Sequence, residues 1–157
     1  MSTIEVTKIA TYSGHKDCIY SIVQGINPAH FFTADGEGMV VIWDLQKPNQ
    51  GEVFAQVPHS IYALCVDVKT NTLLIGENTM GIHLINISNH QQTKSLKITD
   101  GNIFDIITTE HAIMVACGDG KVIVLDKIHH TIQQTIHASD KSARCLAIKG
   151  NTLMVGY

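Results

Sequence analysis

Apolar residues along the chain gather in short runs that are separated by clusters of turn-forming residues. The stretch Asp35-Gly36-Glu37-Gly38, for example, divides two such runs. No window sustains the i, i+3, i+4, i+7 spacing of an amphipathic helix. The pattern therefore predicts an all-β chain of short antiparallel strands. In the first part of the chain the predicted strands are Cys18–Gln24, His30–Ala34, Met39–Asp44 and Gly51–Val57.

Two series of similar segments recur along the chain with a period of 40–42 residues. Four apolar runs fill each period, and a period near 40 is typical of repeat arrays and propellers. One four-stranded sheet cannot bury both of its faces, whereas sheets stacked around an axis cover one another. The sequence therefore predicts a β-propeller. The first series starts at Cys18, Ser60, Asn102 and Ser142, and the second is centred on Trp43, Ile85 and Leu125.

Composition supports the strands and excludes several classes of protein. Isoleucine and valine occupy 33 of the 157 positions, which favours β-structure, and a hydrophobic content of 45% excludes a disordered chain. The net charge is −3, and Arg144 is the single arginine, so we expect no nucleic-acid partner. The first residues lack a signal-peptide pattern, and no apolar run reaches the ~18 residues of a membrane span. We therefore expect a cytoplasmic protein that does not bind a membrane.

Cysteine and histidine spacing gives no metal-site or redox motif. The cysteines lie far apart and form no CxxC pair, so we expect reduced core cysteines and no metal or cofactor. The histidines, including His59, His83 and the pair His129-His130, are not spaced as a ligand set, and we expect them to face solvent in strands or turns. The cysteines are Cys18, Cys65, Cys117 and Cys145.

The first period resembles the WD-repeat family. It carries Gly14-His15, then 27 residues, then Trp43-Asp44. The third period matches at the turn Gly118-Asp119-Gly120 but has Leu125 in place of the tryptophan. The second is degenerate, because Pro58 precedes His59 and Ile85-Asn86 replaces Trp-Asp.

The resemblance implies a hydrogen-bonded chain of side chains within the first blade. It would join His15, Thr33 and Trp43 to a turn carboxylate. Glu37 stands at the family's usual Asp position and Asp35 lies two residues earlier, so either could accept from the imidazole. These residues could be mistaken for a catalytic triad, but the repeat phase already explains them as structural. The resemblance makes Asp119 the equivalent carboxylate of the third repeat.

The resemblance covers the whole chain, as about three and a half blades. Complete propellers typically carry 4–8 blades, and unpaired sheet edges invite association. We expect the ring to be closed by missing C-terminal blades of a longer protein or by self-association. The predicted units are 4–10 as the outer strand of the closing blade, 15–57 as blade 1, 59–98 as blade 2, 102–136 as blade 3 and 142–157 as the first two strands of blade 4.

One position in each innermost strand falls, by the family resemblance, at the rim of the central channel. Tyrosine and arginine are enriched at binding hot spots, so these positions predict a partner-binding ring, with packing between blades as the alternative. They are Tyr20, Tyr62, Phe104 and Arg144, with Asp17 on the same face.

The resemblance implies a non-catalytic scaffold or adaptor that binds proteins or peptides. The alternative is a propeller enzyme with a metal or catalytic carboxylates in the channel, for which the inner strands offer Asp67 and Asp105.

Overall fold

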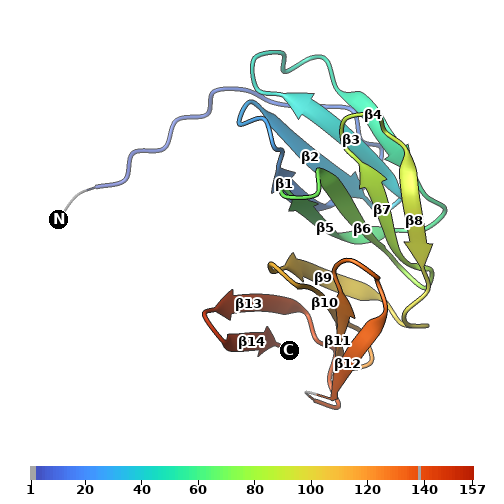
Figure 1. Ribbon diagram of the computed structural model, residues 1–157. Coiled ribbons are helices and arrows are strands. Elements are labelled where there is room, and N and C mark those ends of the chain that lie inside the picture. The colour runs from blue at the N-terminus through green and yellow to red at the C-terminus, as the bar shows by residue number, and fades with distance from the viewer. Residues whose placement is uncertain (1–2, 138) are drawn as a thin grey trace.

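The fold consists of short strands arranged as an open arc of sheets (Figure 1). The computed structural model describes residues 3–137 and 139–157, and in these ranges the chain forms strands and turns without a helix. The all-β prediction is confirmed. None of the described segments is a helix able to cross a membrane.

Three sheets have four antiparallel strands each, and a fourth has two. Blade 1 contains β1 (Ile19–Gln24), β2 (His30–Asp35), β3 (Met39–Asp44) and β4 (Glu52–Gln56). Blade 2 contains β5 (Ile61–Asp67), β6 (Thr72–Glu77), β7 (Gly81–Asn86) and β8 (Gln92–Leu96). Blade 3 contains β9 (Ile103–Thr108), β10 (Ala112–Cys117), β11 (Lys121–Asp126) and β12 (Ile132–His137). The terminal hairpin contains β13 (Cys145–Lys149) and β14 (Thr152–Gly156). The inner strands β1, β5, β9 and β13 lie next to one another along the concave side of the arc (Figure 1).

Tight turns join consecutive strands in each blade, so every sheet is a simple meander. In blade 1 the Oδ1 atom of Asp35 accepts hydrogen bonds from the backbone N–H groups of Glu37 (3.1 Å) and Met39 (2.8 Å). Gly38 completes this turn at a φ of 81°, which glycine adopts without steric cost, and Gly120 holds the same place in blade 3 at 79°. Turn chemistry therefore fixes where the second strand of a blade ends and the third begins.

The hydrophobic core lies between blades. One cluster joins blades 1 and 2 through residues such as Phe32 and Leu73, and another joins blades 2 and 3 through Leu84 and Ile103. A smaller cluster joins blade 3 to Leu146 of the terminal hairpin. Each blade therefore depends on its neighbour to bury its apolar side chains.

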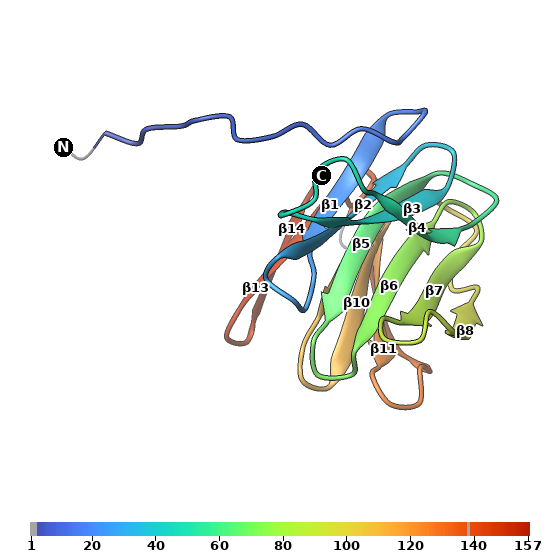
Figure 2. The same ribbon diagram turned by 90° about the horizontal axis from the view of Figure 1, so that it is seen from above.

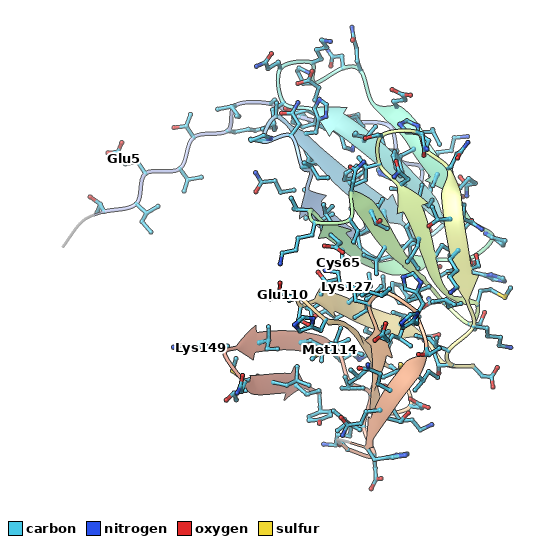
Figure 3. The ribbon with its side chains drawn as sticks, in the orientation of Figure 1. Glu5, Cys65, Glu110, Met114, Lys127 and Lys149 are labelled. Atoms are coloured by element: carbon cyan, nitrogen blue, oxygen red, sulfur yellow. The ribbon has the colours of Figure 1, made fainter. Side chains whose placement is uncertain are left out.

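The segment before β1 is extended and leaves the body of the molecule in both views (Figures 1 and 2). Its predicted strand, 4–10, pairs with no strand in the described ranges, and Ile4 is 90% exposed. Glu5 projects from it well away from the blades (Figure 3). Tyr12 ties the end of this segment to blade 1, because its hydroxyl donates to the Leu45 carbonyl (3.1 Å) and its ring packs edge-on against Phe31.

Within the described ranges, one face of blade 1 has no neighbouring sheet. A hollow of about 630 Å³ lies there over Ile19 and Ile22, and Ile22 is 66% exposed. The prediction that all cysteines are core residues is wrong for Cys18 and Cys145, which are exposed because they lie just before β1 and at the start of β13, in the two end sheets of the arc. Cys117 is buried.

Candidate functional site

A chain of hydrogen bonds connects four side chains of blade 1. The indole Nε1–H of Trp43 donates to Thr33 Oγ1 (2.7 Å), and Thr33 Oγ1 lies 2.6 Å from His15 Nε2. The other ring nitrogen, Nδ1, lies 2.6 Å from Asp35 Oδ2. Asp35 is fully buried, whereas Glu37 is exposed, so the choice between the two carboxylates falls on Asp35 and the prediction for Glu37 is wrong. Every polar group of this buried set has a partner, which identifies it as a structural element of the blade.

Blade 3 has no such chain, and the prediction for Asp119 is wrong. Strand register shows why: Cys117 pairs with Ile103 as Asp35 pairs with Ile19, so Cys117 takes the place of the buried carboxylate. Asp119 is exposed and forms an ion pair with Lys121. Burial, with a smaller contribution from the Asp119 charge, raises the pKa of the Cys117 thiol to about 12.

Blade 2 contains a different polar network, which sequence reasoning missed. Glu77 is fully buried at the end of β6 and contacts two histidines, His59 Nδ1 at 2.8 Å and His83 Nε2 at 2.6 Å. The far nitrogen of His83 lies 2.6 Å from Ser95 Oγ on β8. The expectation that His83 faces solvent is therefore wrong. The signal that could have found this network is the alignment of the repeats, in which Glu77 stands at the position of Asp35.

The predicted ring residues of the first three blades share one backbone feature, a β-bulge. In blade 1 the pairing passes from Ile19 to Ser21, which leaves Tyr20 as the extra residue. Blades 2 and 3 show the same shift at Tyr62 and Phe104. A bulge re-aims the side chain of its extra residue, so the three aromatic rings emerge at one end of the inner strands.

The three rings and the Arg144 guanidinium contact one another in a row across the blades. We call this row the ladder surface: Tyr20, Tyr62, Phe104 and Arg144. Tyr20 meets Tyr62 edge-on with centroids 4.6 Å apart, and Tyr62 stacks on Phe104 at 5.5 Å. The guanidinium carbon of Arg144, just before β13, lies 3.9 Å above the Phe104 centroid. A hollow of about 470 Å³ opens over the ladder surface and Asn102. The structure thus brings all four ring residues together.

The ladder surface is partly packed and partly exposed. Tyr20 and Arg144 are exposed, whereas Tyr62 and Phe104 are half-buried. Asp17 borders the Tyr20 end, where its carboxylate lies beside the backbone of Gly36 and accepts a hydrogen bond from the backbone N–H of Cys18 (2.7 Å). Packing between blades therefore accounts for Tyr62 and Phe104, whereas partner binding by the exposed Tyr20 and Arg144 stays a prediction.

The carboxylates of the inner strands have structural partners. Asp105 Oδ2 accepts a hydrogen bond from the backbone N–H of Leu146 (2.7 Å), which joins blade 3 to the terminal hairpin. Asp67 forms a buried ion pair with Lys127 (2.9 Å) and accepts a hydrogen bond from Thr70 (2.6 Å). Lys127 lies at the junction of blades 2 and 3 (Figure 3). Burial alone raises the pKa of Asp67, but the hydrogen bonds from Thr70 and Lys127 and the Lys127 charge outweigh it, so its pKa lies below the usual value.

The solved structures that resemble this chain include β-propellers. The WD40 β-propeller domain of Doa1 matches with a TM-score of 0.80 and 17% identity over 93% of this chain and 50% of that domain. The computationally designed protein Ika8 matches at a TM-score of 0.77 and 16% identity, over 94% of this chain and 45% of its own. The designed protein Ika4 matches at 0.78 and 15%, over 97% of this chain and 92% of its own. At these identities the likeness shows the fold, and the chain spans about half the length of the Doa1 domain and of Ika8.

Sequence comparison is informative at the level of the family. A search of curated proteins finds no match to the sequence. A family model described as a domain of unknown function, DUF5074, matches residues 15–155, which is most of the chain. The protein therefore belongs to the DUF5074 family and has the propeller fold that WD40 domains share.

Proposed function

We propose that this chain is part of a non-catalytic scaffold that binds other proteins or peptides at the ladder surface. The observation that carries the proposal is the exposed stack at the concave rim of the arc. Tyr20 is 51% exposed although it lies in a strand and its ring packs against the Tyr62 ring. Exposed tyrosine and arginine side chains held in fixed positions are typical of binding hot spots. WD40 propeller domains, whose fold this chain shares, are typically scaffolds, which supports the same function.

The alternative, a propeller enzyme, receives no specific support from the inner strands. Its best candidates, Asp67 and Asp105, each hold two parts of the fold together through the contacts described above. A carboxylate that already neutralises a buried lysine is poorly placed to act as a general acid or base. We therefore retain the scaffold.

The proposal is tested by quantitative capture with two exposed ladder variants, Tyr20→Ala and Arg144→Ala. Because both side chains are exposed, their loss removes partner contacts with little effect on the fold. We expect each variant to retain the wild-type melting temperature while binding of captured partners falls roughly tenfold. Thr135→Ala on the outer strand β12, also exposed, is the matched control. Variants that capture as wild type does, or that lose capture only by unfolding, would show that the ladder surface is a packing element.

The second part of the proposal concerns the uncovered faces of blade 1 and of the terminal hairpin. Ile22 on β1 and Met154 on β14 (48% exposed) leave apolar surface that a further sheet would bury. Such a sheet would come from more blades of a longer chain or from a second copy. We expect this chain alone to self-associate in light scattering, and a stable monomer that binds no apolar dye would contradict this part.

A further inference from the structure

The hollow over the ladder surface is lined by hydrogen-bond donors that have no acceptor. Arg144 uses one face of its guanidinium for the Phe104 ring, and stacking leaves its in-plane N–H groups free. In the described part of the chain no carboxylate lies within ion-pair distance of Arg144. Its positive charge is therefore available to a bound molecule.

The two tyrosines add donors of the same kind. Among the residues that the structure describes, neither the Tyr20 nor the Tyr62 hydroxyl has a hydrogen-bond partner, and both tyrosines line the hollow. The pKa of Tyr20 is raised, first by the nearby Tyr62 hydroxyl and then by burial, so the Tyr20 hydroxyl stays a donor at neutral pH. A surface that combines a free cation with free hydroxyls suits a partner rich in acceptors.

We propose that the ladder surface binds an acidic peptide segment, in which one Asp or Glu carboxylate bonds to Arg144 and an apolar side chain about two or three residues away packs against the tyrosine rings. This inference rests on the proposed scaffold function and specifies its partner. The Phe104 ring lies between the Arg144 guanidinium and the Tyr62 ring. The distance from the guanidinium carbon to the Phe104 centroid (3.9 Å) and the distance from there to the Tyr62 centroid (5.5 Å) together equal roughly three residues of extended peptide at about 3.3 Å per residue.

The number and placement of charges favour a carboxylate over a phosphate. Arg144 presents a single planar fork, which matches one carboxylate in a bidentate pair. A phosphate group is usually held by several cationic side chains, and among the described residues that line the hollow Arg144 is the one cation. Asp17 at the opposite end of the surface repels acid there, so the acidic residue must lie at the Arg144 end. The apolar residue of the peptide therefore lies toward Tyr20.

The test is selection from a random peptide library displayed on phage, with the wild-type chain as bait. We expect Asp and Glu to be enriched in the selected peptides about two or three residues from an apolar residue. The best peptide, made synthetically, should bind the Arg144→Gln variant about tenfold or more weakly, because a hydrogen bond to a charged group is lost. Its affinity should also fall as salt is raised, since the pair lies at an exposed site. Lys149→Gln, an exposed lysine at the tip of the terminal hairpin (Figure 3), should bind as wild type does.

Each of the other outcomes of this experiment refutes a defined part of the proposal. Peptides that need Tyr20 but show no acidic enrichment, or that bind Arg144→Gln unchanged, refute the acidic partner and leave the scaffold intact. A phosphoserine version that binds tenfold more tightly than the Asp or Glu peptide refutes the carboxylate assignment. If no selected peptide depends on Tyr20 or Arg144, both the inference and the binding role of the ladder surface fail.

Discussion

Replacing Thr33 by valine tests whether the hydrogen-bond chain of blade 1 stabilises the fold. The change keeps the shape of the side chain and removes its hydroxyl. Trp43 is 2% exposed, so its indole N–H loses its acceptor without access to water, and the buried His15 Nε2 loses its partner too. Each unpaired group costs about 1–3 kcal/mol, and the added methyl returns about 1 kcal/mol. We expect the free energy of unfolding to fall by about 1–5 kcal/mol.

Urea unfolding followed by far-ultraviolet circular dichroism measures this effect. The control is Thr135→Val, the same exchange at an exposed position on β12. A double-mutant cycle with Trp43→Phe sharpens the test, because the cost of Thr33→Val should shrink once the indole N–H is absent. A cost within about 0.5 kcal/mol of the control, or one that is the same in both backgrounds, would refute the reasoning.

Three further predictions follow from groups described above. Asp67→Asn should cost about 3 kcal/mol near neutral pH because it leaves Lys127 buried and unpaired. Because the folded pKa of Asp67 is lowered, this difference should be present above the unfolded value of about 3.9 and should vanish as pH falls through the folded pKa in acid denaturation. A thiol reagent at pH 8 should leave Cys117 unmodified in the folded protein while it labels the exposed cysteines, and early labelling of Cys117 in peptide mapping would contradict its burial. Gly120→Ala should lower stability by more than about 1 kcal/mol in urea unfolding, because φ is positive there and the new methyl would collide with the Ser139 carbonyl; Gly150→Ala, with positive φ and open space, isolates the conformational part.

The period of the sequence was enough to predict the fold. Segments such as those around Trp43 and Leu125 recur because each blade repeats the same meander, and the strands follow directly from apolar runs and turns. The ladder surface was predicted for the same reason, since equivalent positions in successive blades lie side by side. What repeats in the sequence also repeats in space.

Features that depend on pairing between strands were not visible in the sequence. The bulge at Tyr62 is a shift of β5 against β6, and neither strand records it alone. The network around Glu77 was missed because His83 lies on β7 at a position where blade 1 has Val41. The prediction for Asp119 was wrong because this residue matches the motif by its place in the sequence, whereas strand pairing puts Cys117 at the buried position.

The placement of apolar clusters between sheets has a consequence for how the molecule opens. A sheet with two neighbours is held from both sides, whereas blade 1 and the terminal hairpin are each held from one. In such a linear array, stability is a sum of nearest-neighbour couplings, so disruption starts at the ends and travels inward. Backbone amides of β13 and β14 should exchange with deuterium fastest and those of β6 slowest, and Arg144 would then leave the ladder surface before the tyrosines do.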